Sequence, residues 1–83
     1  MAFNPDRIQV WINQRCKVGD GWDYTSRLYA DWKQWIEAPE RRGEAGTVKA
    51  FAQALKARGF EQRRDGRGNG FYRIWIKRPR YGA

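Results

Sequence analysis

The sequence predicts an α+β domain in which three helices and a short strand precede a C-terminal β-hairpin. Apolar residues recur at helical spacing in two stretches, residues 25–39 and 47–58. After Phe60 the spacing changes to alternation, and glycines at 66–70 separate two short runs that are typical of strands. These two periodicities, in that order along the chain, are the observations that predict the fold class.

A first helix is expected at residues 5–17. Asn4 is a suitable cap, and Pro5 fits the first helical position, where its missing N–H costs nothing. Apolar residues then follow at helical spacing as far as Cys16. The segment VGDGWDY is expected to break this helix and to leave only residues 22–24 as a short extended piece.

The second helix has the strongest pattern in the chain. Thr25 or Ser26 is expected to cap it, and Pro39 prevents it from continuing. Its apolar face consists of Leu28, Trp32, Trp35 and Ile36. Because Trp11, Trp32 and Trp35 lie on apolar helix faces, we expect all three in the core.

The third helix is expected at residues 48–58. Thr47 is its N-cap, and Gly59 followed by Phe60 is typical of a Schellman C-terminus. A hairpin at residues 61–77 then completes the fold.

Alternation along the second hairpin strand predicts which side chains face the core. Tyr72, Ile74 and Ile76 are expected to face inward, and Phe71, Arg73, Trp75 and Lys77 outward. Trp75 is expected either to be covered by Phe3 or Trp22 or to be offered to a partner. The order of elements is typical of a winged helix-turn-helix, with the hairpin as its wing.

Length and charge limit the possible functions. With 83 residues, one domain is expected at 1–83, with an ordered core at about 4–78 and a frayed tail at 79–83. The net charge is +8, of which residues 1–40 contribute −1 and residues 41–83 contribute +9. This asymmetry indicates a polyanionic partner that meets the C-terminal half.

The residue types present give little support for catalysis. One cysteine and no histidine exclude an internal disulfide and a zinc cluster, and the carboxylates are scattered among arginines. We therefore expect no enzyme activity, no cofactor and no bound metal. Without a membrane span or a signal peptide, the expected location is the cytoplasm, in a bacterium or in the host cell of a mobile element.

The glycine-rich turn shares glycine spacing with nucleotide-binding loops and with the RNA-recognition strand motif, but it matches neither in full. Gly66, Gly68 and Gly70 lie between two strands, whereas nucleotide-binding loops lie between a strand and a helix. Arg67 and Phe71, with two of these glycines, match part of the RNA-recognition strand motif, but Asn69, Tyr72 and Ile74 do not. A basic hairpin tip is the interpretation that remains.

The residue pattern therefore favours contact with DNA through the third helix and the hairpin. Lysine, glutamine and arginine can reach base edges or phosphates, and a helix N-terminus can hold a phosphate. The expected contact residues are Thr47, Lys49, Gln53, Lys56, Arg63, Arg64, Arg67, Asn69 and Arg73, with Arg41, Arg42 and Trp75 as additional candidates.

Three segments, LYADWKQW, TVKAFAQALKARGF and GFYRIWI, carry a family resemblance that spans roughly residues 8–77. Together they resemble the C-terminal winged-helix domain of phage, plasmid and poxvirus-type helicase–primases. The resemblance implies a DNA-contacting domain of a mobile-element replication or regulatory protein, with no activity of its own. The chain departs from that family in its long loop EAPERRGEAG and in having neither the ATPase nor the polymerising domain.

Two other functions stay open at this point. The hairpin and Trp75 could bind a protein of a replication complex, which would make the chain an adaptor. Alternatively, Trp75 and Phe71 could stack on the bases of single-stranded DNA or RNA, which requires both side chains to be exposed.

Overall fold

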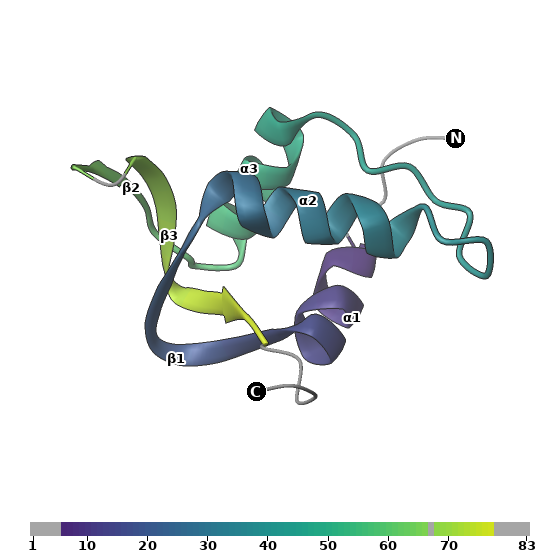
Figure 1. The fold of residues 1–83 in the computed structure, drawn as a ribbon, viewed down its shortest axis with the longest axis horizontal. Helices are drawn as coiled ribbons and strands as arrows, with labels where there is room; N and C mark the ends of the chain where they lie inside the picture. The colour runs from purple at the N-terminus through teal and green to yellow at the C-terminus, as the bar shows by residue number, and fades with distance from the viewer. Residues whose placement is uncertain (1–5, 67, 78–83) are drawn as a thin grey trace, which may run out of the picture.

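The described part of the chain folds into three helices and three strands (Figure 1). The computed structural model describes residues 6–66 and 68–77. The elements are α1 (Asp6–Arg15), β1 (Cys16–Tyr24), α2 (Thr25–Ile36), α3 (Val48–Ala57), β2 (Gln62–Asp65) and β3 (Gly68–Ile76). The strands form one antiparallel sheet in the order β1-β3-β2, so the predicted α+β class is confirmed. The tail predicted to fray, at 79–83, lies outside the described residues.

Helix α1 ends two residues earlier than predicted, at Arg15. Its buried face consists of Ile8, Trp11 and Ile12, as the helical spacing predicts. At its C-terminus, Lys77 Nζ donates hydrogen bonds to the carbonyl oxygens of Asn13 and Gln14, at 3.4 and 3.3 Å. A cation is favourable there because the helix dipole is negative at that end. The predicted start of this helix, with Asn4 and Pro5, lies outside the described residues.

Strand β1 is the largest difference from the prediction. The sequence predicts a break with only three extended residues, whereas the strand runs over nine, Cys16–Tyr24. Its register against β3 shifts between Val18 and Trp22, so that the three residues between them lie opposite Arg73 alone. A β-bulge of this kind accommodates glycines that would otherwise interrupt a strand. The segment is extended because β3 supplies its hydrogen-bond partners.

Helix α2 begins without the predicted cap. Thr25 is the first helical residue, Tyr24 occupies the N-cap position, and no side chain caps the helix. The prediction that Thr25 or Ser26 is the cap is therefore wrong. The Thr25 hydroxyl is buried and instead accepts a hydrogen bond from Gln62 Nε2 at 3.3 Å, which ties α2 to β2. The helix ends before Pro39, as predicted.

The connection between α2 and α3, residues 37–47, is fastened to α2 by two aromatic side chains. Trp32 Nε1 donates to the carbonyl oxygen of Ala45 at 2.9 Å, and the Tyr29 hydroxyl donates to the carbonyl oxygen of Gly46. Ala45 is itself buried in the core. The length of this connection therefore does not prevent α3 from packing on α2.

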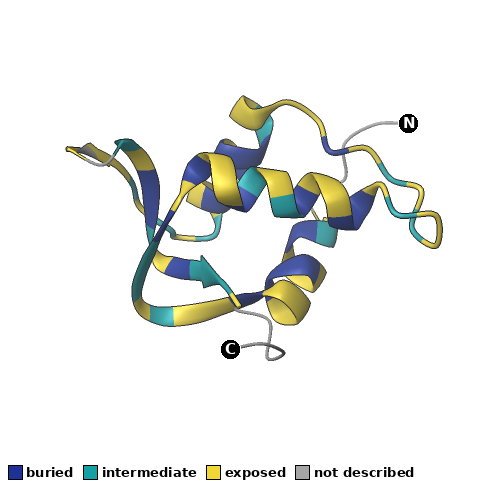
Figure 2. Ribbon diagram, in the orientation of Figure 1, coloured by how far each residue is buried: buried dark blue, intermediate teal, exposed yellow. Residues whose placement is uncertain are grey.

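The core is built around aromatic rings. Trp11 lies edge-on to Trp32 and to Phe51, with ring centroids 6.0 and 5.6 Å apart, and all three side chains are fully buried. Trp35 is buried beside them, so the prediction for the three helical tryptophans is confirmed. Figure 2 shows the buried residues on the sides of the helices and of β3 that face one another.

Within residues 6–66 and 68–77, no helix is both long enough and apolar enough to cross a membrane.

The two faces of β3 differ from simple alternation. Phe71 and Ile74 are both 0% exposed and both belong to the core, although strict alternation would place them on opposite faces. Between them, Arg73 has φ 75°, and its left-handed backbone lies at the register shift opposite β1. The prediction that Phe71 faces outward is wrong, and so is the prediction that Tyr72 shares the core face of Ile74.

Candidate nucleic-acid interface

Helix α3 presents a polar outer face because its apolar residues are confined to the other side. Phe51 and Leu55 are fully buried, and Lys49, Gln53 and Lys56 are exposed. All three predicted contact residues of this helix therefore lie at the surface together. Their helical positions, three and four residues apart, place them on one face.

Both ends of α3 are fixed as predicted. Thr47 is the N-cap, and its hydroxyl accepts a hydrogen bond from the Ala50 N–H at 3.0 Å. At the other end, Phe60 N–H donates to Leu55 O and Gly59, with φ 93°, completes a Schellman motif. The Thr47 hydroxyl is thus engaged in capping, and the Schellman turn leads the chain directly into the hairpin.

The hairpin projects away from the helices at one end of the molecule (Figure 1). Arg64 pairs with Asn69 across the two strands close to the turn. Both side chains are exposed. Arg67, the third arginine predicted at this tip, lies outside the described residues. The hairpin therefore carries Arg64 and Asn69 together at its far end.

Arg63 is held more tightly than its neighbour. It is exposed, and its guanidinium lies over the ring of Tyr72, 5.3 Å from the centroid. It also donates to the Glu61 carboxylate at 3.1 Å. Because exposed ion pairs of this kind are worth only about 0–1 kcal/mol, the pair leaves Arg63 able to exchange Glu61 for a phosphate.

Arg73 lies apart from the tip. It is exposed, but it occupies the register shift near the middle of the sheet. A left-handed backbone at a residue other than glycine costs roughly 1–2 kcal/mol, which the surrounding strands must offset. The structure therefore separates this predicted contact from Arg64 and Asn69.

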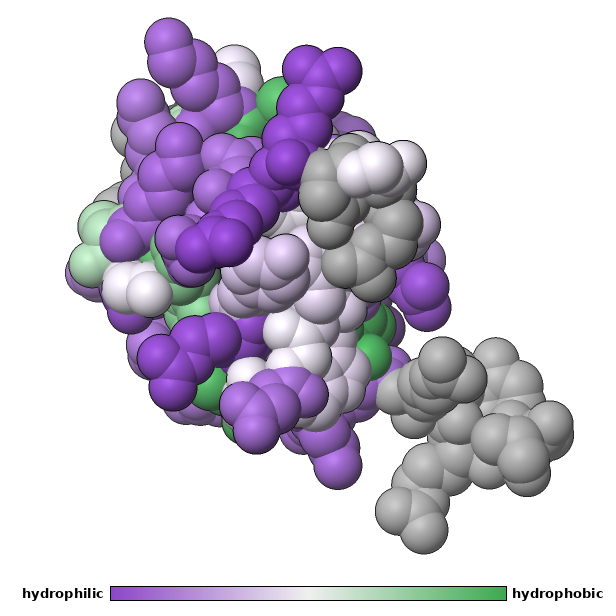
Figure 3. All heavy atoms as spheres, turned by 90° about the vertical axis from the view of Figure 1, so that its left-hand side faces the viewer, coloured by the Kyte–Doolittle hydropathy of each residue, from purple (hydrophilic) through white to green (hydrophobic). Residues whose placement is uncertain are grey.

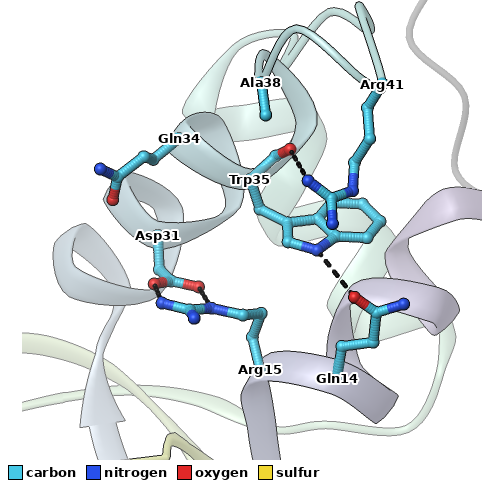
Figure 4. Close-up of a pocket in the computed structure, with 7 residues that line it drawn as sticks. All are labelled: Gln14, Arg15, Asp31, Gln34, Trp35, Ala38 and Arg41. Atoms are coloured by element: carbon cyan, nitrogen blue, oxygen red, sulfur yellow. Dashed lines mark hydrogen bonds and ion pairs between the residues drawn. The ribbon is translucent and has the colours of Figure 1, made fainter. Parts of the chain in front are cut away.

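Arg41 and Arg42, the two additional arginine candidates, lie in the loop at the end of α2, away from the hairpin (Figure 1). Figure 4 shows the guanidinium of Arg41 across the ring of Trp35, and the distance to the ring centroid is 4.1 Å. It also donates to the Trp35 carbonyl oxygen at 3.1 Å, while Arg7 donates to the Arg41 carbonyl oxygen. Arg41 therefore fastens the loop, and Arg42 is exposed beside it.

A hollow of about 460 Å³ opens between α1, α2 and this loop (Figure 4). On one side, Asp31 accepts a hydrogen bond from Trp11 Nε1 at 2.9 Å and two from the Arg15 guanidinium. The hydrogen bonds to Asp31 raise the pKa of the Arg15 guanidinium above its usual value. On the other side, Trp35 Nε1 donates to the Gln14 side chain. The Arg15–Asp31 and Gln14–Trp35 pairs thus link α1 to α2 around the hollow.

Helix α3 and the hairpin carry cations that are free to meet a polyanion, as do Lys17 on β1 and Arg42 in the loop after α2. Within residues 6–66 and 68–77, no ion pair involves Lys49, Lys56 or Arg64. Figure 3 looks at the hairpin end and shows strongly hydrophilic side chains over much of that face. The positive excess of the C-terminal half is therefore displayed where a polyanion can approach.

Cys16, the one thiol of the chain, is buried. Burial raises the pKa of the Cys16 thiol to about 12, so at neutral pH it is protonated and a poor nucleophile. Residues 6–66 and 68–77 contain no group of three His, Cys, Asp or Glu side chains placed to share a metal ion. The exposed faces of α3 and the hairpin present cations and hydrogen-bond donors.

Trp75 is half-buried by its own chain. The indole lies against Gly19 and Gly21 of the β1 bulge. Phe3, one of the predicted covers, lies outside the described residues, and Trp22 lies on Gly70 instead. Trp22, Tyr24 and Tyr72 were not among the predicted contact residues. The alternation of Trp22 and Tyr24 within the predicted extended piece at 22–24 was the available signal, but nothing local indicated that this piece pairs with β3.

Comparison with known proteins gives no further indication of function. A comparison with protein families, with curated proteins and with solved structures found no match in any of the three. The function must therefore follow from the exposed face of α3, the hairpin and the distribution of charge.

Proposed function

We propose that this chain is a winged-helix domain that binds double-stranded DNA and catalyses no reaction. The observation that carries the proposal is that exposed polar and cationic side chains follow one another from α3 into the hairpin. The lysines and glutamine of α3 are followed, after the connection at residues 58–61, by a projecting hairpin with exposed Arg64 and Asn69. The order of elements and the sheet order β1-β3-β2 support the winged-helix assignment.

The dimensions and chemistry of α3 suit a DNA groove. A helix with its side chains is about 10–12 Å across, close to the roughly 12 Å width of the major groove. Beside the two lysines, Ala57 is small and exposed and Ala50 partly so, which allows the helix to approach the groove floor. Gln53, between the lysines, can donate to and accept from a base edge.

The hairpin supplies contacts of another kind. Arginine side chains at a projecting tip can follow the phosphate backbone or enter the minor groove. Arg63 and Arg64 carry this role among the described residues, and Arg67 is assigned to it by the sequence alone. Because such contacts are insensitive to base identity, the hairpin would set affinity and α3 would set preference.

The biological setting rests on the resemblance of the three sequence segments. On that resemblance we propose that the domain belongs to a replication or regulatory protein of a phage or plasmid and acts in the cytoplasm without a cofactor. Arg73, Arg41 and Arg42 are secondary in this proposal, because they lie apart from the hairpin tip.

The test is the salt dependence of duplex binding. If about five phosphates are contacted, a plot of log affinity against log salt has a slope of about −4 to −5. Replacing Lys49, Lys56 and Arg64 by glutamine removes three contacts and should reduce the slope to about −2. The matched control is three charge removals elsewhere, beginning with Lys33→Gln on α2, which changes the net charge without touching α3 or the hairpin.

A slope near zero for the unaltered chain would refute the electrostatic basis of the proposal. An equal loss of affinity in the α3–hairpin triple variant and in a control with three distant charges removed would show that net charge alone is responsible. Replacing Gln53 by alanine should change sequence preference in a randomised duplex library. Unchanged preference would assign α3 to positioning and not to base reading.

A further inference from the structure

The sheet has a second face, opposite the core, that carries aromatic side chains. Tyr72 adjoins core-facing Phe71, and its cross-strand partner is Trp22, so both point away from the core. Tyr24 shares the side of Trp22 by alternation. We call this surface the aromatic face, and its members are Trp22, Tyr24, Tyr72 and Trp75. None of the four belongs to the core cluster.

Two of the rings lie against glycine residues. A Cβ on Gly21 would be 2.2 Å from a ring carbon of Trp75, and a Cβ on Gly70 would be 2.1 Å from a ring carbon of Trp22. Such closeness means that each indole rests directly on the strand opposite it. One side of each indole is therefore held in place, and both side chains remain partly exposed.

The third ring extends the same surface outward. Tyr24 is 39% exposed and meets Trp22 at a ring-centroid distance of 4.6 Å. Rings that are ordered before binding lose little conformational freedom when a flat ligand stacks on them. The rings of the aromatic face are therefore ordered in advance for stacking by a flat group such as a base.

Cations border these rings. Arg63 lies over Tyr72, and exposed Lys17 is the cross-strand partner of Trp75. The nearest acidic group is Asp23, between Trp22 and Tyr24, whose buried carboxylate accepts hydrogen bonds from the Tyr24 and Ile76 N–H groups and pairs with Arg27 at 3.8 Å. Asp20 lies in the bulge, and Glu61 is paired with Arg63. Aromatic rings bordered by arginine and lysine match a chain of bases linked by phosphates better than an apolar protein segment.

The helices leave this surface open. Figure 1 shows α1, α2 and α3 gathered on the other side of the sheet, where Phe71 and Ile74 meet them. A patch of partly exposed aromatic rings on a small domain is characteristic of a binding surface.

We propose that the aromatic face binds single-stranded DNA, with bases stacked on its rings and phosphates near Arg63 and Lys17. The inference rests on the proposed function for a nucleic-acid partner, and it adds the strand state and a second surface. Strand β3 runs from the hairpin turn to the aromatic face, so the two surfaces are continuous. A duplex held at the hairpin would place an unpaired strand across the rings, and the domain would then hold a junction between duplex and single strand.

The experiment compares a 15-nucleotide oligothymidine with a blunt 15-base-pair duplex by fluorescence anisotropy at one salt concentration. Tyr24→Ser removes the most exposed ring of the face. It should keep the fold, because Tyr24 occupies an uncapped N-cap position where serine is favoured. Loss of one stacking ring should weaken single-strand binding about tenfold and change duplex binding less than about twofold.

Two control variants sharpen the result. Tyr24→Phe keeps the ring and should bind the single strand as the unaltered chain does. Val10→Ser removes an apolar side chain of similar exposure, 45%, from α1 and should change neither affinity. Circular dichroism confirms that each variant is folded.

The outcomes separate this inference from the proposed function. Duplex binding without single-strand binding, or single-strand binding that Tyr24→Ser leaves intact, would overturn the role of the aromatic face alone. Single-strand binding that depends on Tyr24, without any duplex binding, would support the face and refute the proposed function. Tighter binding of oligouridine than of oligothymidine would overturn the assignment to DNA.

Discussion

Substitution of Gly70 by alanine tests the packing of the sheet most directly. A Cβ there would lie 2.1 and 2.3 Å from two ring carbons of Trp22 and 2.7 Å from the carbonyl oxygen of Asp23. Carbon atoms in contact prefer about 3.5–4.0 Å, so the ring must move by more than an ångström. Moving the ring does not relieve the contact with Asp23, because that atom belongs to the backbone of β1.

Overpacking usually costs about 1–3 kcal/mol. Because one clash is with strand backbone, we expect Gly70→Ala at the upper end, about 3 kcal/mol. For a domain of this size each kcal/mol lowers the melting temperature by about 4–8 °C, which predicts a fall of about 12–24 °C. The loss is a large part of a total stability of about 4–12 kcal/mol.

Two other glycines provide graded controls for the same substitution. Gly59 has φ 93° but nothing within 4 Å of an added Cβ, so only backbone strain of about 1 kcal/mol is expected. Gly66 also has open space, and its alanine variant should stay within about 0.5 kcal/mol of the unaltered chain. Urea and thermal unfolding followed by circular dichroism measure all three. Equal midpoints for Gly70→Ala and Gly66→Ala would refute the described contact between Trp22 and β3.

Two further predictions concern buried polar groups and are measured by urea unfolding. Asp31→Ala should cost about 2–3 kcal/mol, because Trp11 Nε1 and the Arg15 guanidinium lose their acceptor, whereas Asp31→Asn keeps one acceptor and should cost less. A cost below about 0.5 kcal/mol would contradict the network at the end of α1. Burial raises the pKa of the Cys16 thiol from 9.0 to about 12, so the unfolded chain loses this proton first, and the free energy of unfolding should fall as pH rises from about 9 to about 12. Cys16→Ala should show a shallower fall over that range, and identical slopes would remove the thiol as a cause.

Local signals were sufficient for α3. Its N-cap, its apolar spacing and its glycine C-terminus lie within fourteen consecutive residues, and the structure confirms the cap and the Schellman turn. The exposure of Lys49, Gln53 and Lys56 follows from the same spacing. Predictions of this kind succeed because the interactions that determine them are close in sequence.

The predictions that failed depend on residues distant in sequence. Strand β1 is extended because β3, some fifty residues later, pairs with it, and its glycines alone indicated a break. Phe71 faces the core because Arg73 and the β1 bulge together alter the alternation of β3. The aromatic face went unrecognised for the same reason, since it exists only when β1 and β3 are paired. Arg41 differs, because Trp35 is only six residues earlier, but its guanidinium reaches that ring through the path of the loop, which turns back so that Gly43 N–H bonds to Ile36 O.

The bulge in β1 also affects how copies of the chain meet one another. In the sheet order β1-β3-β2, β1 and β2 are the edge strands, and exposed edges can pair with edges of other molecules and aggregate. The bulge interrupts regular pairing along one edge, while the other edge is only four residues long and carries Arg63 and Arg64. Charge and irregularity of this kind oppose strand addition by a second copy. The arginines that we assign to phosphate binding thus also protect the sheet from assembling with itself at the high local concentrations that a shared DNA molecule would create.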